Sequence, residues 1–159
     1  MNKRQTKSGV QERVRHMLVV ERLCSRFHLI AQQLPSRFRV ENERDVQDLL
    51  RALLVLEHDD IRPQTWTPGY AEGNARTDFL LRLEQIVLEA RLAQDRLDAA
   101  MLNEQLAIDI RQHAQQPDCK TLVCFIYDPA GRVANPRAIE HELSGERDGL
   151  TVRVIIAPH

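Results

Sequence analysis

The sequence predicts a mixed α/β domain whose central sheet is covered by helices. Apolar residues recur at intervals of three and four in several segments, which is the period of an amphipathic helix. Short runs rich in β-branched and aromatic residues lie between these segments. Strands that alternate with helices favour a sheet with helices packed against it. With 159 residues, of which 43% are hydrophobic, the chain fits one domain spanning residues 1–159.

Helices are expected at four places along the chain. The first, over residues 11–34, stops before Pro35 and forms an N-terminal helical extension. Asn42 followed by Asp45 has the spacing of a helix N-cap, and an apolar stripe follows it. The other helices are expected over residues 43–57, 97–116 and 136–143.

Strands are expected at residues 78–81, 86–89, 121–127 and 151–157. The first two are separated by a few residues only, so they predict a hairpin. Residues 63–74 contain several prolines and glycines and are expected to form a loop. A turn is expected over residues 144–149, before the last strand.

Charge is distributed unevenly along the chain. Residues 1–40 hold nine Lys and Arg against two Asp and Glu, a net charge of +7, whereas the whole chain carries −1. A basic segment suits contact with a phosphate backbone, with Arg13 and Arg15 as candidate contacts. The same charge is also common on solvated helical faces that bind nothing, so both readings stay open.

Several protein classes are excluded by composition. The three cysteines lack the spacing of a disulfide scaffold or a zinc ribbon, and the six histidines show no metal-ligand spacing. No apolar run is long enough to span a membrane, and the first ten residues are too polar for a signal peptide. We therefore expect a cytoplasmic protein without a membrane partner.

Asp78 and Glu89 lie on the two strands of the expected hairpin. If the loop centres on Leu83 and Glu84, paired positions sum to 167, and Asp78 faces Glu89. Directly opposed residues have Cβ atoms about 4.5–5.5 Å apart, where two carboxylates repel unless a cation lies between them. Such a pair suits Mg²⁺ or Mn²⁺. A loop of odd length would shift the register, and two solvated carboxylates on a polar face are the alternative.

The amino-acid sequence around this pair resembles the PD-(D/E)XK nuclease superfamily, and more narrowly its bacterial restriction-endonuclease-like branch. The resemblance runs from about Asn42 to the C-terminus and is carried by Arg76-Thr77-Asp78-Phe79-Leu80-Leu81, Ile86-Val87-Leu88-Glu89-Ala90-Arg91 and Glu104-Gln105-Leu106. It implies a restriction-endonuclease-like fold over residues 41–159, a nuclease core preceded by the basic helical segment 1–40. It also implies hydrolysis of phosphodiester bonds in nucleic acid, with DNA favoured.

The resemblance assigns roles by position. Asp78 and Glu89 would bind Mg²⁺ or Mn²⁺, and Glu43 of the first core helix would add to the metal shell. Gln105 in the following helix would face the site, although a glutamine that bonds backbone at the helix–sheet seam is an equal alternative. Arg76, next to the aspartate, is a further candidate for nucleic-acid contact.

Arg91 stands where the family pattern has a lysine. An arginine stays protonated, so it can orient a phosphate or stabilise developing charge but cannot accept a proton. Two hypotheses follow. The first is a metal-dependent nuclease weakened by Arg91, which as a homodimer would cut both strands. The second is a catalytically inactive module of the same fold that binds nucleic acid or a protein partner.

Overall fold

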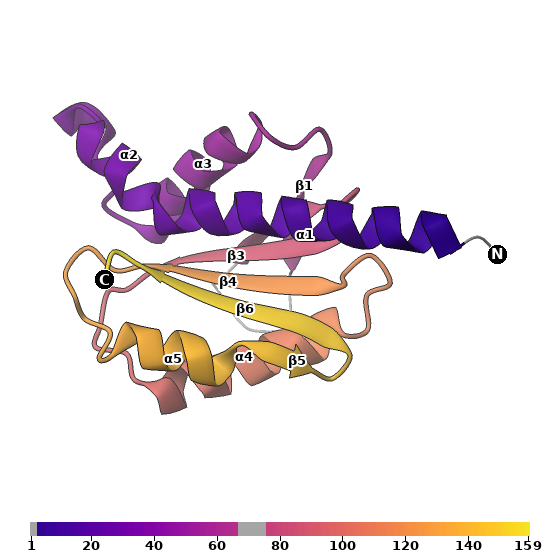
Figure 1. Ribbon diagram of the computed structural model, residues 1–159. Coiled ribbons are helices and arrows are strands. Elements are labelled where there is room, and N and C mark those ends of the chain that lie inside the picture. The colour runs from indigo at the N-terminus through magenta and orange to yellow at the C-terminus, as the bar shows by residue number, and fades with distance from the viewer. Residues whose placement is uncertain (1–2, 67–75) are drawn as a thin grey trace.

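The computed structural model describes residues 3–66 and 76–159, and it shows one sheet between two layers of helices (Figure 1). One face of the sheet is covered by α1 (Lys3–Ser25), α2 (Phe27–Gln33) and α3 (Glu43–Leu54). The other face is covered by α4 (Ala99–His113) and α5 (Pro136–Leu143). This arrangement confirms the expected mixed α/β class and is consistent with a restriction-endonuclease-like fold.

The sheet has six strands in the order β1-β2-β3-β4-β6-β5. β2 is antiparallel to both of its neighbours, β1 and β3. β3, β4 and β6 run parallel to one another, and β5 returns antiparallel to β6. The parallel strands are joined through α4 and α5, which explains why both helices lie on one face. The strands span Ile61–Trp66, Arg76–Leu81, Ile86–Leu92, Thr121–Tyr127, Gly145–Arg147 and Leu150–Ala157.

The expected loop over residues 63–74 was wrong at its start, because Ile61–Trp66 forms strand β1. Pro63 argued against a strand, since proline cannot donate a ladder hydrogen bond. β1 is an edge strand, where that donor is not needed on the outer side. Residues 67–74 of the expected loop lie outside the described residues. At the other edge of the sheet, the expected turn over residues 144–149 also contains strand β5. This strand has only three residues, too few to show a strand pattern in the sequence.

Three of the four predicted helices lie where they were expected but have different ends. The single helix expected over residues 11–34 is divided at Arg26 into α1 and α2. α3 begins with the predicted capping box of Asn42 and Asp45 and ends at Leu54, three residues early. α4 is shorter than the expected 97–116, and α5 matches its prediction. No helix among the described residues is both long and apolar enough to cross a membrane.

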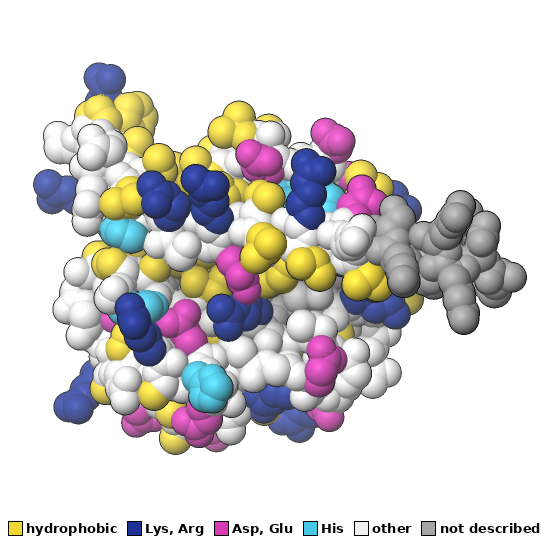
Figure 2. Space-filling view, viewed as in Figure 1, with side chains coloured by type: hydrophobic (Ala, Val, Ile, Leu, Met, Phe, Trp, Pro, Cys, Tyr) yellow, Lys and Arg dark blue, Asp and Glu magenta, His cyan; other side chains and the backbone are white. Residues whose placement is uncertain are grey.

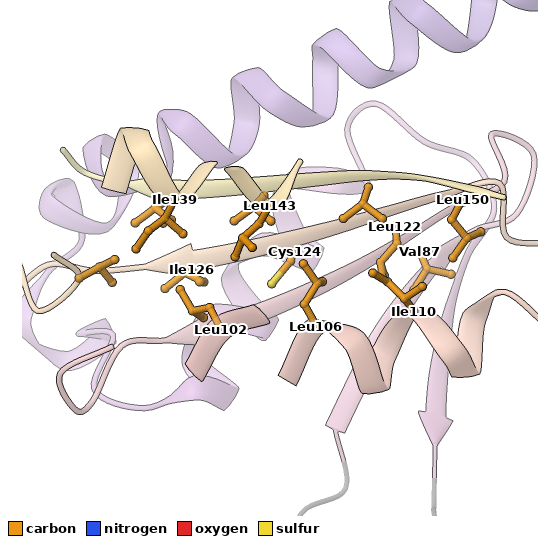
Figure 3. Close-up of a cluster of buried hydrophobic side chains, with 14 of the residues drawn as sticks. Val87, Leu102, Leu106, Ile110, Leu122, Cys124, Ile126, Ile139, Leu143 and Leu150 are labelled. Atoms are coloured by element: carbon orange, nitrogen blue, oxygen red, sulfur yellow. The ribbon is translucent and has the colours of Figure 1, made fainter. Parts of the chain in front are cut away.

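The sheet separates two hydrophobic cores. The core under α4 and α5 is shown in Figure 3 and includes Val87, Leu106 and Leu122. The core under α1 and α3 includes Leu50, Leu88 and Phe125. The alternative of a solvated carboxylate on a polar face was therefore wrong for Glu89, which is buried. Both faces of β3 are covered, so its charged side chains have to be satisfied within the protein.

Candidate active site

The β2–β3 hairpin has the predicted register. Phe79 pairs with Leu88, and Leu81 pairs with Ile86 across a four-residue connection, so paired positions sum to 167 as expected. The backbone of Asp78 lies in β2, one residue beyond the last of these pairs. Its side chain, like that of Arg76, lies outside the described residues.

Glu89 and Arg91 project from β3 toward α4. Alternate residues of a strand share a face, and Val87, two positions earlier, packs in the core beneath α4. Glu89 is 2% exposed, and the Arg91 side chain is 11% exposed. A buried carboxylate and a nearly buried guanidinium thus lie two residues apart on one face of a central strand.

The Arg91 guanidinium is held by acceptors from two elements. Nη1 donates to Gln105 Oε1, and Nη2 donates to Asp109 Oδ2 at 2.5 Å and to Glu89 Oε2 at 3.3 Å. Two of these acceptors lie on α4, so the guanidinium ties that helix to β3. Gln105 therefore uses its side-chain oxygen on Arg91, which favours a place in this cluster over the alternative of a bond to backbone.

Electrostatics keep Arg91 charged. Burial alone would lower the pKa of the guanidinium, but its interactions with Cys124 and with the carboxylates of Glu89, Asp109 and Glu43 outweigh burial and raise that pKa above its ordinary value. Arg91 therefore remains a cation at any working pH and takes no part in proton transfer.

Two residues of this cluster were missed from the sequence. Asp109 and His113 follow Gln105 at intervals of four, so the three form a polar stripe on one face of α4. Both are buried, and His113 Nε2 lies 3.8 Å from Glu89 Oε1. Polar residues at every fourth position of an otherwise apolar helix face were the signal that could have revealed them.

The predicted site residues are only partly brought together. Glu89, Arg91 and Gln105 are in contact, and Glu43 at the start of α3 lies near enough for its charge to act on Arg91. Arg13 and Arg15 are exposed on α1, in the layer on the other side of the sheet from α4. The structure does not place these two arginines beside the Glu89 cluster.

The donor set of the cluster fits a hard divalent cation. Its described carboxylates, on Glu43, Glu89 and Asp109, outnumber the one guanidinium among them. Mg²⁺ and Mn²⁺ prefer carboxylate oxygens and retain water in their shells. Glu89 and Glu43 could hold such an ion. Asp109 is less suited, because its Oδ2 already accepts a hydrogen bond from Arg91 Nη2 at 2.5 Å.

A second group of ligand-type side chains lies on the α1 and α3 side of the sheet. His16, His58 and Glu84 each offer one atom within 4.8 Å of the others. The histidines show no metal-ligand spacing in the sequence, but the fold brings two of them beside a glutamate. The three residues are brought together only by folding, from α1, from the segment after α3 and from the β2–β3 connection.

Asp109→Ala is expected to lower the free energy of unfolding by about 3–5 kcal/mol, because it removes one carboxylate from a buried charged cluster. Urea denaturation would measure this. Glu104→Ala, an exposed substitution on the same helix, is the control and should cost less than about 0.5 kcal/mol. Equal effects of the two substitutions would contradict a structural role for the Asp109–Arg91 pair.

Comparison with known protein families adds an independent finding to this geometry. The model of the DpnII-MboI restriction endonuclease family matches residues 18–159, which is most of the chain. No curated protein and no solved structure gives a significant match. The match agrees with the restriction-endonuclease-like fold and with the resemblance seen in the hairpin. The chain belongs to the DpnII-MboI family of restriction endonucleases, and this membership indicates a DNA-cleaving nuclease.

Proposed function

We propose that the protein is a Mg²⁺- or Mn²⁺-dependent DNA endonuclease of the cytoplasm whose site is built on the β2–β3 hairpin. The observation that carries the proposal is the buried contact of Glu89 with Arg91 and, through it, with Gln105, in a chain that belongs to a restriction endonuclease family. Burying a carboxylate that is only 2% exposed costs free energy unless a nearby positive charge compensates it.

The backbone register supports Asp78 as the second carboxylate. The pairing of β2 with β3 runs from Leu81 and Ile86 to Phe79 and Leu88. One further step in this register would bring position 78 opposite position 89. Glu43, from the start of α3, would complete an acidic set drawn from three elements.

A bound Mg²⁺ would polarise the scissile phosphate and lower the pKa of an attacking water. The chain's own residues would prepare that site. The Arg91 Nη2 hydrogen bond at 3.3 Å fixes the direction of the Glu89 carboxylate, and the guanidinium supplies a permanent positive charge near the reacting phosphate. Because Arg91 cannot accept a proton, it acts by charge and position alone.

The competing function is a DNA-binding module that has lost cleavage. The observation that favours it is that the described hydrogen bonds of the Arg91 guanidinium all run to acceptors within the protein. The remaining nitrogen, Nε, is buried without a hydrogen-bond partner. A guanidinium held in this way has fewer donors to offer a phosphate than a free one.

Metal-dependent cleavage tests the proposal. We expect wild-type protein to bind Mg²⁺ or Mn²⁺ and to cut plasmid DNA, and we expect Asp78→Asn and Glu89→Gln to lower the cleavage rate at least about 10²-fold. Calorimetry and plasmid cleavage on the same samples would measure both. Glu104→Gln, on the exposed face of α4, is the matched control and should leave both unchanged.

DNA binding that persists in chelator, together with no cleavage by any metal-loaded sample, would favour the binding module. Cleavage that survives both carboxylate substitutions would exclude the proposed site.

Arg91→Lys is expected to raise the cleavage rate by about tenfold or more. A lysine in this setting can carry its ammonium to the attacking water, and a positioned acid–base group contributes about 10²–10⁴-fold. Plasmid cleavage compared with Arg91→Gln, which removes the charge, would measure this. Unchanged or lower activity in a folded Arg91→Lys protein would show that position 91 does not correspond to the lysine of the family pattern.

We also propose that two copies act together, because one site per chain cuts one strand at a time. The surface that suits a second copy is an apolar stripe on α1. Val10, Val14 and Leu18 are 54%, 54% and 60% exposed at intervals of four, while Val20 of the same helix is fully buried. Figure 2 shows hydrophobic side chains gathered along α1 and α2 on this face of the molecule.

Leu18→Glu is therefore expected to shift the protein from two copies to one in light scattering after size exclusion. A charge placed in an apolar interface is left desolvated and unpaired. Leu83→Glu, at another exposed leucine on the β2–β3 connection, should leave the assembly unchanged. Identical masses for wild type and Leu18→Glu would contradict an interface at this stripe.

A further inference from the structure

Two histidines and a glutamate meet on the side of the sheet opposite α4. His58 Nδ1 lies 3.2 Å from Glu84 Oε1, and His16 Nδ1 lies 3.8 Å from the same oxygen. The two imidazole rings have centroids 5.7 Å apart and are tilted at 43° to each other. All three side chains thus converge on one small volume.

The spacing of these atoms matches a tetrahedral metal site. Nitrogen and oxygen ligands lie about 2.0–2.1 Å from Zn²⁺, so two ligand atoms of a tetrahedron lie about 3.4 Å apart. The measured 3.2 Å and 3.8 Å lie on either side of that value, and the whole set lies within 4.8 Å. Imidazole nitrogens select ions of the zinc class over Mg²⁺, which prefers oxygen alone.

The three side chains satisfy one another only in part, through the hydrogen bond between His58 Nδ1 and Glu84 Oε1 at 3.2 Å. The side chains of His58 and Glu84 are 0% and 6% exposed, yet Glu84 Oε2 and His58 Nε2 are buried without a hydrogen-bond partner. A buried carboxylate with an unused oxygen is costly, and a cation at the shared volume would offset that cost. Arg82, the described arginine nearest to Glu84 in the sequence, instead contacts the partly buried Asp60 at 3.7 Å.

The group is separate from the proposed nuclease site. α1, which carries His16, lies on one side of the sheet, whereas α4, which carries Gln105 and Asp109, lies on the other. Glu43 of the proposed nuclease site begins α3, and His58 follows the opposite end of that helix. The group's ligand type also differs, with two imidazoles in place of an all-carboxylate set. His16 lies before residue 18, where the family match begins.

We propose that His16, His58 and Glu84 bind a divalent transition-metal ion of the zinc class. The ion joins three segments that are distant in the sequence: α1, the chain that leaves α3, and the β2–β3 connection. His16 is 25% exposed at its side chain, so the fourth coordination position is open to water. The ion therefore fixes the middle of α1 to the β2–β3 connection and to the chain that follows α3.

Metal-depleted full-length protein titrated with Zn²⁺ by calorimetry, and with Co²⁺ by visible absorption, tests this site without using nuclease activity. We expect one ion per chain, the spectrum of four-coordinate Co²⁺, and a Tm raised by about 5–10 °C when Zn²⁺ is about 100-fold above its Kd. The same titration in Glu89→Gln keeps the signal, because that substitution affects only the other site.

His16→Gln and Glu84→Gln are expected to weaken Zn²⁺ binding at least about 100-fold and to abolish the Tm shift, because loss even of an outer partner of a ligand costs 10–100-fold. His16 is partly exposed, so its variant should fold even where substitution of buried His58 does not. His141→Gln, at an exposed histidine on α5, is the matched control and keeps full binding. Zn²⁺ binding that survives His16→Gln and Glu84→Gln, or no binding by the wild type, overturns the proposal.

Discussion

The guanidinium of Arg91 sets a condition that β3 and α4 must meet together. An arginine that is 11% exposed needs acceptors for its donors and negative charge nearby, because an uncompensated buried cation costs several kcal/mol. Glu89 on the strand and Asp109 and Gln105 on the helix meet that need. Since hydrogen bonds are directional, this contact fixes the position of α4 along the sheet more closely than apolar packing alone would.

The rest of the layer follows from that fixed position. Leu102, Leu106 and Ile110 of α4 lie in one core with Val87 and Leu122, so the helix buries an apolar stripe beside its polar one. The stripe of Gln105, Asp109 and His113 then lies over the charged end of β3 rather than over the apolar strands β4 and β6. A change in helix register by one residue would rotate the polar stripe by about 100° and leave Arg91 without two of its acceptors.

The sequence predicted the class of fold, the hairpin and its register, because each of these depends on local periodicity and on a four-residue connection. It failed at β1, where Pro63 is acceptable only because the strand lies at an edge, a property of the whole sheet. The resemblance named Glu89, Arg91 and Gln105, which the structure brings into contact, but it did not include Asp109 and His113 of the same cluster. His16, His58 and Glu84 could not be found at all, since long-range folding alone brings them together.

An arginine at position 91 suits this particular cluster on geometric grounds. An ammonium has three donors on one atom, whereas a guanidinium spreads five donors over a plane and can reach acceptors on two elements at once. Here Nη1 reaches Gln105, and Nη2 reaches both Asp109 and Glu89. The same bonds that stabilise the seam between β3 and α4 also hold Glu89 in a single orientation. The raised pKa of the Arg91 guanidinium keeps every one of its protons in place, so this side chain cannot accept a proton.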